Sequence, residues 1–454
     1  MADVPTLPSI RILAGFYGDF PAFLREASAK HGPIVRFRSM FFRRPDVYLI
    51  NDPAAIEEVL VTKGGAFEKS RGARRLRQIV GTGLLTSDEP QHLAHRRLVQ
   101  PAFHRKRLEE FARVMSRATA ERVAGWRDGD LIDVDAQTSR LALEIVSNAL
   151  FGVDLSPADM RTISRSLDVS MGMYLFWQTP LSELFDHWPL PNVRRFKAAR
   201  AQLWDVVARI VQRHRTDGVD RGDLLSMLLS ARDEDGRGGL SDDEIRDEAL
   251  TILLAGHETT ANALAWTFYL LQRHPEIEAA LHRHVDEVLE GRDVTFDDVA
   301  KLDYARAIFA ETMRLYPPAW VTSREAMKPV TIGGVELATG DLAIVSPYVT
   351  HRDARVWPNP EAFDPQRFLD GRPRERYAYF PFGGGSRMCI GDSFAWTEGV
   401  IAIATIAQRA RLERTSESEV DIRPLVTLRP RTPIAARVRL RRPVPAGRAS
   451  ATPA

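Results

Sequence analysis

Apolar residues recur at helical spacing along most of the chain, and the longest such segment runs from residue 241 to residue 274. It opens with Ser241 and Glu244, which have the spacing of a capping box, and it stops directly before Pro275. At 1.5 Å per residue this helix would span on the order of 50 Å, enough to cross a whole domain. Its middle, residues 249–271, is apolar nearly all round, which predicts burial on every side.

Shorter periodic segments predict further helices, and short apolar runs predict a few strands. A first short helix is expected to end near residue 30. Further helices are expected to cover residues 54–62, 88–103, 133–151, 193–215, 275–290, 303–315 and 393–409. Strands are expected at 34–38 paired with 47–50, at 330–337 around a Gly-Gly turn, at 342–346, and at 425–428 paired with 435–440. The pattern predicts a mainly α protein with small β-sheets, in the α+β class.

Two segments stand out from this pattern as candidate walls of a ligand pocket. Residues 64–82 show little periodicity, and residues 171–177 form a patch of Met and aromatic side chains between helical patterns. Soft side chains of this kind adapt to irregular ligands. The alternatives for the second segment are ordinary core or a surface that touches a membrane.

The chain, residues 1–454, is expected to form one domain, although its length alone would suit about three. No Ser/Pro/Gly-rich linker, low-complexity tract or repeat divides it. Residues 1–20 contain an acidic residue, two early prolines and no long apolar run, so neither a signal peptide nor a membrane anchor is expected. Residues 443–454 are expected to be a disordered tail, which leaves a core of residues 21–440.

Charge and cysteine content narrow the class of function. The formal net charge is +2, with 62 basic and 60 acidic residues, which argues against nucleic acid as the main partner. The single cysteine, Cys389, excludes an intramolecular disulfide and fits a reducing compartment, so a cytoplasmic location is expected.

Cys389 lies in a glycine-rich loop directly before a helical pattern. A thiolate is a nucleophile and a metal ligand, and glycines let the backbone approach a flat ligand, so the loop suits a thiolate bound to haem iron. A structural cysteine and a phosphate loop are the alternatives, but the Lys-Ser/Thr of a phosphate loop is missing. The spacing Phe382-x-x-Gly385-x-Arg387-x-Cys389-x-Gly391 resembles the haem-ligand loop of the cytochrome P-450 family.

A second motif interrupts the long apolar helix. Residues 255–260 read Ala-Gly-His-Glu-Thr-Thr. Small Ala255 leaves room for a ligand, Thr259 can bond back to an earlier carbonyl, and Glu258 can exchange a proton with solvent. The sextet resembles the oxygen-activation motif of the same family, (Ala/Gly)-Gly-x-(Asp/Glu)-Thr-Thr. By this resemblance Thr259 and Glu258 organise proton delivery.

A third motif lies on the predicted basic helix before residue 103. His92 and Arg96 are one helical turn apart, so both can face one acidic group. A solvated basic face, or a zinc pair of His92 and His95, are the alternatives from spacing alone. The cytochrome P-450 family has an aromatic residue or histidine followed by arginine at this spacing, and both reach a haem propionate.

The fourth motif is the pair Glu311 and Arg314, which spacing alone would leave as an ordinary ion pair. In the family such a pair is buried in a structural role and is completed by an arginine of a Pro-x-Arg-Phe loop, here Arg367. The resemblance also assigns Arg324 and Arg387 to the propionates, and Phe382, Ile390 and Gly391 to the surroundings of the sulfur. The candidate pocket residues are Phe176, Ala255, Trp320 and Val321.

The resemblance spans about residues 21–440 and implies a haem-thiolate monooxygenase carrying haem b (iron protoporphyrin IX), with Cys389 as the iron ligand. Such an enzyme inserts one atom of dioxygen into a lipophilic substrate by hydroxylation or epoxidation. The mostly apolar pocket segments indicate a terpene, fatty acid, steroid or polyketide. The alternatives are a haem-thiolate enzyme that uses peroxide or catalyses isomerisation or coupling, and a non-catalytic haem-binding protein. The Glu258–Thr259 pair favours dioxygen chemistry.

The resemblance also implies that electrons come from a ferredoxin or flavodoxin with its NAD(P)H-dependent reductase, because the chain has no room for a fused flavin domain. Two basic groups are candidates for the surface that binds this donor. They are either that surface or ordinary solvated residues: Arg105, Lys106 and Arg107, with Arg372, Arg374 and Arg376.

Overall fold

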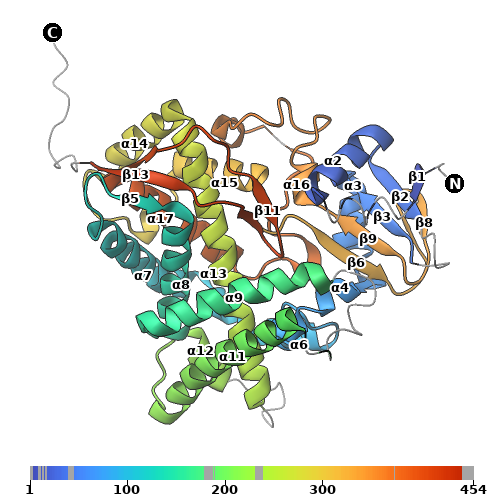
Figure 1. The fold of residues 1–454 in the computed structure, drawn as a ribbon, viewed down its shortest axis with the longest axis horizontal. Helices are drawn as coiled ribbons and strands as arrows, with labels where there is room; N and C mark the ends of the chain where they lie inside the picture. Colours follow the sequence, from blue (N-terminus) through green and yellow to red (C-terminus); the bar gives the residue numbers. More distant parts are fainter. Residues whose placement is uncertain are drawn as a thin grey trace.

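The long apolar helix is the axis of the fold in the computed structural model of the protein. This helix, α13, covers Asp242–Arg273 and begins with the predicted capping box of Ser241 and Glu244. It runs through the middle of the molecule with other helices packed around it, and a sheet lies to one side (Figure 1). The structure describes residues 4–8, 12, 15, 18–38, 45–177, 188, 190–230, 239–372 and 374–441.

Most helices begin and end within a few residues of the predicted bounds, because capping residues fix them. The carboxylate of Asp133 caps α8, and Gly152 ends it in a left-handed conformation. The predicted helix at 54–62 continues from α3 into a π-helical turn, Glu58–Thr62. The other described helices are α2 (Phe20–His31), α3 (Pro53–Glu57), α4 (Arg71–Arg74), α5 (Arg77–Val80), α6 (Gln91–Val99), α7 (Arg105–Ala124), α8 (Val134–Phe151), α9 (Pro157–Trp177), α11 (Pro191–Asp217), α12 (Leu224–Ser230), α14 (Pro275–Leu289), α15 (Asp303–Leu315), α16 (Pro347–Thr350) and α17 (Asp392–Arg409).

The largest sheet combines segments from three parts of the chain. Its strand order is β1-β2-β3-β9-β6-β4, and β2 pairs with β3 as the predicted antiparallel hairpin. The smaller sheets are β10-β13-β5, β11-β12 and β7-β8. The strands are β1 (Thr6–Pro8), β2 (Ile34–Arg38), β3 (Val47–Ile50), β4 (Phe67–Lys69), β5 (Leu131–Asp133), β6 (Thr322–Ala326), β7 (Val330–Ile332), β8 (Val335–Leu337), β9 (Leu342–Val345), β10 (Ala410–Arg414), β11 (Ile422–Pro424), β12 (Leu428–Pro430) and β13 (Ala435–Leu440).

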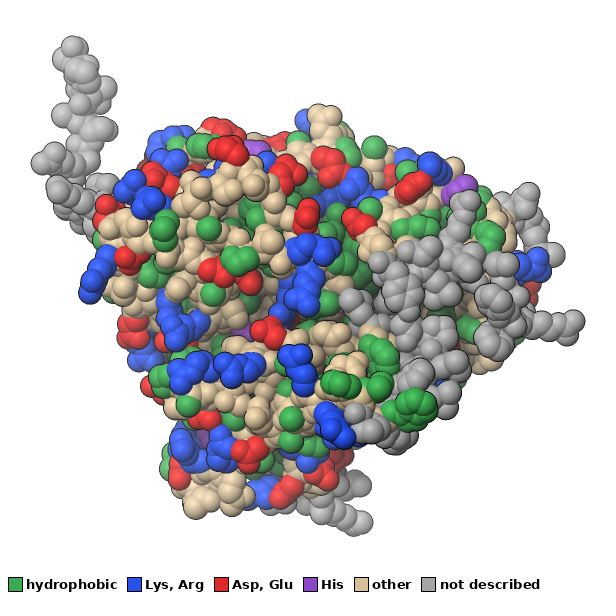
Figure 2. All heavy atoms as spheres, in the orientation of Figure 1, with side chains coloured by type: hydrophobic (Ala, Val, Ile, Leu, Met, Phe, Trp, Pro, Cys, Tyr) green, Lys and Arg blue, Asp and Glu red, His purple; other side chains and the backbone are tan. Residues whose placement is uncertain are grey.

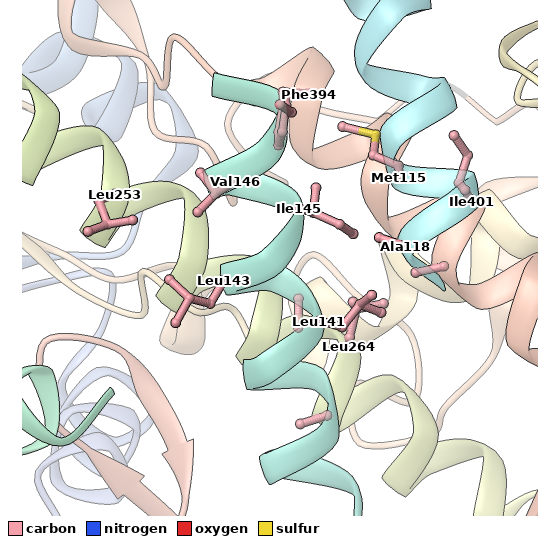
Figure 3. Close-up of a cluster of buried hydrophobic side chains, with 14 of the residues drawn as sticks. Met115, Ala118, Leu141, Leu143, Ile145, Val146, Leu253, Leu264, Phe394 and Ile401 are labelled. Atoms are coloured by element: carbon pink, nitrogen blue, oxygen red, sulfur yellow. The ribbon is translucent and has the colours of Figure 1, made fainter. Parts of the chain in front are cut away.

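The main hydrophobic core lies where α8 packs between α13 and the pair α7 and α17. Figure 3 shows Val146 and Leu143 of α8 on the side of Leu253 of α13, while Ile145 faces Met115 of α7. These side chains are almost completely buried, and burying each one stabilises the fold by about 1.5–3 kcal/mol. The packing holds α13, and with it residues 255–260, in a fixed position.

Three sequence predictions about secondary structure were wrong. Residues 64–82 are not a plain loop: they hold a 3-10 turn (Gly64–Ala66), β4, α4 and α5, which are too short to show periodicity. Residues 171–177 do not separate two helices but form the last turns of α9. The strands at 425–440 do not pair with each other, because β12 pairs with β11 while β13 lies between β10 and β5.

The surface carries both signs of charge. Figure 2 shows Lys and Arg side chains intermingled with Asp and Glu over the visible face, as the small net charge predicts. Within the described ranges, no helix has both the length and the apolar character needed to cross a membrane. The predicted disordered tail, residues 443–454, lies outside the described residues.

Candidate active site

A large internal cavity of about 1130 Å³ lies between α13 and the loop that contains Cys389. Its walls come from many elements: α9 contributes Phe176, β6 contributes Arg324, and the turn after β11 contributes Leu425. Most of the lining is apolar side chain, and its charged residues are all basic, Arg71, Arg423 and Arg431 among them. A cavity of this kind is the usual place for a cofactor and a lipophilic substrate.

The cysteine loop is held by its own backbone and by glycine. The Cys389 N–H donates to the Phe382 carbonyl at 3.0 Å. Gly385 has a φ of +68°, and a Cβ atom there would lie 2.0 Å from the Leu60 carbonyl oxygen, so only glycine fits. Phe382, Ile390 and Gly391, which the resemblance assigns to the surroundings of the sulfur, line the cavity together with the cysteine.

The Cys389 side chain is accessible, but to the interior cavity rather than to the outer surface. Burial raises the pKa of the thiol to about 11, and the backbone N–H of Gly391 acts in the opposite direction. The free thiol is therefore protonated at neutral pH. A coordinated metal would remove this proton, because it stabilises the thiolate far more than the amide does.

Several basic side chains lie close together in the cavity wall. His92, Arg96, Arg324 and Arg387 all line the cavity, and so does Lys69, which the sequence reasoning missed. Burial and the charge of Arg387 lower the pKa of Lys69 to about 7, and the same two causes lower the pKa of Arg324 to about 10. Basic groups that lower one another's pKa in this way form a site that a bound anion would stabilise.

Arg96, Arg387 and Lys69 are held in place by backbone carbonyls of the cysteine loop or of the segment before α6, whereas Arg324 is bonded within its own strand, to the Thr322 hydroxyl at 3.0 Å and to the Ser323 carbonyl at 3.1 Å. Arg96 donates to the Met388 carbonyl at 2.7 Å, and Arg387 donates to the Ser87 carbonyl at 3.0 Å. Lys69 donates to the Ser87 carbonyl at 2.8 Å. The His92 ring is hydrogen-bonded to Glu89 at 2.9 Å, while burial and Arg387 lower its pKa.

A thiol that faces a mostly apolar cavity, with several basic side chains close together in the cavity wall, fits an iron-containing group that carries carboxylates, as haem does. Zinc held by His92 and His95 is not supported. The His95 ring is hydrogen-bonded to Glu248, and the described residues contain no group of three or more His, Cys, Asp or Glu side chains that could hold a metal ion.

The opposite wall of the cavity is the middle of α13. Ala255, Gly256 and Thr259 line it, and the Thr259 hydroxyl donates to the Ala255 carbonyl at 2.6 Å. A Cβ atom on Gly256 would lie 2.8 Å from Cγ2 of Val146, so this glycine also lets α8 approach closely. The Thr259 hydroxyl is thus presented at the cavity surface.

Glu258 points elsewhere, and it is not among the residues that line the cavity. Its carboxylate is hydrogen-bonded to Thr427 at 2.7 Å and to Asn262 at 3.0 Å, and it forms an ion pair with Arg429 of β12. Burial would raise the pKa of Glu258, but Arg429 and its neighbours lower it to about 2. Arg429 also binds Asp168 of α9. Sequence reasoning missed this partner because nothing local to Glu258 indicates it.

Glu311 and Arg314 are completely buried on α15 and form an ion pair at 2.6 Å. Arg367 approaches Glu311 to 3.3 Å from the loop that carries it. The remaining donors of Arg314 bind the carbonyls of His351 at 2.7 Å, Pro360 at 2.6 Å and Ala362 at 2.9 Å. This cluster fastens α15 to the segment that leads to the cysteine loop.

The four candidate pocket residues, Phe176, Ala255, Trp320 and Val321, all line the cavity. Trp320 is oriented by a hydrogen bond from Nε1 to the Leu425 carbonyl at 3.0 Å. The C-terminal part of the chain reaches the cavity through residues 423–426 and through Arg431.

Comparison with known proteins gives a consistent result. The family model described as Cytochrome P450 matches residues 5–436. Cyclooctatin synthase of Streptomyces melanosporofaciens is 40% identical over 408 residues, covering 88% of this chain and 87% of that protein. Cyclooctat-9-en-7-ol 5-monooxygenase of the same organism is 36% identical, covering 84% and 83%. Pentalenene oxygenase of Streptomyces avermitilis is 35% identical, covering 89% of each.

Among solved structures, the cytochrome P450DA heme domain is similar to this chain over nearly its full length. The TM-score is 0.84 at 28% sequence identity, and the match covers 97% of this chain and 98% of that one.

Proposed function

The chain belongs to the cytochrome P450 family and is a haem-dependent monooxygenase, and we propose that it oxidises a cyclic terpenoid with electrons from a separate donor protein. The observation that carries this proposal is the single thiol that faces a mostly apolar cavity, with a group of basic side chains in the same cavity wall. The haem, when bound, supplies the activation of dioxygen.

In this proposal the role of each residue follows from its place in the cavity wall. Cys389 would hold the haem iron through its sulfur, while Phe382 and Ile390 would shield the sulfur from water. The basic side chains would hold the two carboxylates of the haem, and the Thr259 hydroxyl would hold a proton donor at the cavity wall formed by α13. The residues proposed for the carboxylates are Lys69, His92, Arg96, Arg324 and Arg387.

The proposed substrate class rests on the lining and on the relatives. The cavity wall away from the cations is mainly apolar, with Phe176, Trp320 and Val321 among its side chains. Such a wall favours a lipophilic molecule and offers few groups to bind a strongly polar one. The relatives at 35–40% identity are named for cyclooctatin, cyclooctat-9-en-7-ol and pentalenene. We therefore favour a terpenoid over the fatty acids, steroids and polyketides.

The electron donor in this proposal is a ferredoxin or flavodoxin with its NAD(P)H-dependent reductase. Arg105 has a strongly exposed side chain at the start of α7 and can meet an acidic partner. Arg374 is less available, because its guanidinium lies over the rings of Trp357 and Phe368. We therefore place the stronger weight on residues 105–107.

The experiment that tests the proposal is the carbon monoxide difference spectrum of the reduced protein, with Cys389→Ala as the comparison. We expect a strongly red-shifted Soret band that the substitution abolishes, because the thiolate changes the electronic structure of the haem. A band at the position of imidazole-ligated haem in the folded wild-type protein would contradict the assignment of Cys389.

The substrate class is tested by adding cyclooctat-9-en-7-ol and a set of cyclic terpene hydrocarbons to the oxidised protein and following the spin-state shift. Lauric acid serves as a control of similar apolar length but different shape. We expect the cyclic compounds to shift the spectrum at lower concentration. A preference for the fatty acid would contradict the terpenoid assignment and leave the monooxygenase chemistry intact.

A further inference from the structure

The last turns of α9 place a tyrosine in the cavity wall. Tyr174 lines the cavity, and so do Gly172 and Phe176 beside it. Part of the Tyr174 surface is accessible, yet burial raises the pKa of its hydroxyl to about 12, so bulk solvent is far from this group. The accessible surface of Tyr174 therefore faces the cavity and not the outside of the molecule.

The Tyr174 hydroxyl has no partner among the residues that the structure describes. No hydrogen bond and no charged neighbour acts on its pKa, for which burial is the single cause. A hydroxyl that has lost its water and gained no hydrogen bond is unfavourable. A hydrogen bond to a molecule in the cavity would remove this penalty.

Most other hydroxyl groups of the cavity wall are already engaged. Ser70 and Ser323 are bonded to each other at 2.6 Å, and the Thr322 hydroxyl accepts from Arg324 at 3.0 Å. The Thr259 hydroxyl donates to a carbonyl of its own helix. Each of these groups therefore already has a hydrogen bond within the protein.

Two further hydroxyls of wall residues are turned toward the protein instead. The Thr251 oxygen is buried without a partner, and a Cβ atom on Gly83 would lie 2.3 Å from it. The Thr260 hydroxyl acts on the buried carboxyl of Glu398. Among the described residues that line the cavity, Tyr174 is thus the one whose hydroxyl is both unpartnered and accessible from within.

We propose that Tyr174 donates a hydrogen bond to an oxygen atom that the substrate already carries, so that the enzyme acts on an oxygenated cyclic terpenoid, an alcohol or a ketone, rather than on the parent hydrocarbon. This inference rests on the proposed function and narrows its substrate class. Near neutral pH the Tyr174 hydroxyl keeps its proton and can donate it. The bond fixes the orientation of the carbon skeleton, and with it the C–H bond that is presented for oxidation.

A substrate of this class places the enzyme after a first oxygenating step. Cyclisation of an isoprenoid chain gives a hydrocarbon when the final carbocation loses a proton, and an alcohol when that carbocation adds water. The reaction that supplies the substrate is therefore either a cyclisation that ends with the addition of water or an earlier oxidation of the hydrocarbon. The present enzyme then adds a further oxygen atom.

Spin-state titration of the oxidised, haem-loaded protein tests the role of Tyr174. The probes are cyclooctat-9-en-7-ol and the hydrocarbon of the same skeleton without the hydroxyl group, each added to wild type and to Tyr174→Phe. We expect Tyr174→Phe to raise the half-saturating concentration of the alcohol by about tenfold, as the loss of one hydrogen bond to a buried group predicts. Binding of the hydrocarbon should not weaken, because the hydrocarbon leaves the hydroxyl unpaired in wild type.

The comparison of the two probes separates recognition from a structural effect. A variant with a distorted cavity would bind both probes more weakly. Tyr304→Phe, which removes a hydroxyl of α15 outside the cavity, is the matched control and should leave both titrations unchanged. Equal effects of Tyr174→Phe on the alcohol and on the hydrocarbon, or no effect on either, would overturn the inference.

Infrared spectroscopy tests the same bond in the wild-type protein and does not depend on a variant that folds. The probe is fenchone, a cyclic terpene ketone, with an isotopic label in its carbonyl group. We expect its carbonyl stretch to lie at lower frequency in the wild-type protein than in hexane, and to return toward the hexane value in Tyr174→Phe. A hexane-like frequency in the wild-type protein would overturn the inference.

A second pair of probes, dodecanol and dodecane, keeps this outcome separate from the proposed terpenoid class. If this pair shifts the spectrum and no cyclic terpenoid does, the terpenoid assignment is wrong, and the effect of Tyr174→Phe on this pair decides the role of Tyr174. If the cyclic pair shifts the spectrum but Tyr174→Phe affects both members equally, the proposed function stands and the inference fails. Absence of a shift with every probe would overturn both.

Discussion

Lys69 shows how a single residue reports on the group that the cavity is built to hold. Its amine is buried beside Arg324 and Arg387, and its pKa of about 7 lies well below the ordinary 10.5. A lysine that loses its charge this easily is poorly accommodated without an anion. Bound haem carboxylates would restore the charge, so the pKa of Lys69 should rise when the haem is loaded.

The pKa of Lys69 gives a prediction about stability and pH. Between pH 7 and pH 10.5 the unfolded chain binds a proton at Lys69 that the folded haem-free protein does not bind. The contribution of Lys69 to the free energy of unfolding therefore rises with pH in this window, by up to about 1.4 kcal/mol per pH unit, and levels off above it.

Chemical denaturation of the haem-free protein at several pH values measures this contribution as the difference between wild type and Lys69→Met. Lys30→Met, at an exposed lysine paired with Glu26, is the control and should follow the wild-type curve. The same pH dependence in Lys69→Met as in wild type would show that Lys69 keeps its charge in the folded protein. In the haem-loaded protein the difference should shrink.

At the scale of elements, Arg429 joins three parts of the fold. It lies on β12 and forms ion pairs with Glu258 of α13 and Asp168 of α9. Glu258 is buried, whereas the Asp168 side chain is 62% exposed. Removing the cation from Glu258 should therefore destabilise the fold far more than removing it from Asp168, because only the Glu258 carboxylate would be left buried and unpaired.

Arg429→Leu should lower the free energy of unfolding by about 3 kcal/mol, because it leaves the carboxylate of Glu258 buried without a cation. Asp168→Asn, which removes the exposed partner of the same arginine, should cost less than about 1 kcal/mol. Urea denaturation of both variants measures the difference. If Glu258→Gln added to Arg429→Leu recovered none of the loss, the unpaired carboxylate would not be its cause.

Local sequence patterns predicted the helices and the hairpin well. They did not predict strand pairs or side-chain contacts between residues far apart in the sequence. The capping box of α13 and the β2–β3 hairpin could be read from the sequence because their partners lie a few residues apart. β4 pairs with β6, more than 250 positions away, and nothing in either segment indicates the other. Lys69 and Arg429 were missed for the same reason, because their roles depend on neighbours that only the folded chain supplies.

The spacing of motif residues predicted a residue's contacts in two situations. Either the partners lie a few residues away in the sequence, or the family pattern names a distant partner. Spacing alone would have left Glu311 and Arg314 as an ordinary surface pair, yet both are fully buried. The resemblance to the family supplied Arg367. Several strands separate Arg367 from Glu311 in the sequence, but its Nε atom lies 3.3 Å from the Glu311 carboxylate in the structure.

At the scale of the whole molecule, positive and negative side chains are mixed over the surface and the net charge is small (Figure 2). A donor protein would therefore be recognised by particular groups of charged residues rather than by the overall charge. Arg105 is one of these groups: its side chain is 81% exposed and forms only a long ion pair, 3.8 Å, with Glu109. Arg107 is engaged by Glu110 at 3.0 Å and is less free to meet a partner. An acidic donor would be attracted to this end of α7 most strongly at low ionic strength.

Replacing Arg105 and Arg107 by Glu should slow reduction of the haem by a ferredoxin by about tenfold at low salt, because reversed charge weakens electrostatic attraction. Stopped-flow reduction at several salt concentrations measures this, and the difference should fade as salt rises. Arg209→Glu on α11, at another exposed arginine, is the control. Equal rates for the double variant and wild type at low salt would exclude this surface.

The cavity draws its walls from both ends of the described chain, from Ile12 before α2 to Arg431 after β12. A ribosome adds residues in order, so the segment around Leu425 is among the last of these walls to be made. Until it emerges, Trp320 lacks the carbonyl to which its Nε1 donates, and α13 lacks the cation of Arg429. Stable capture of the cofactor is therefore a late event in biosynthesis, and a chain stalled shortly before residue 423 would have an open, weakly binding pocket.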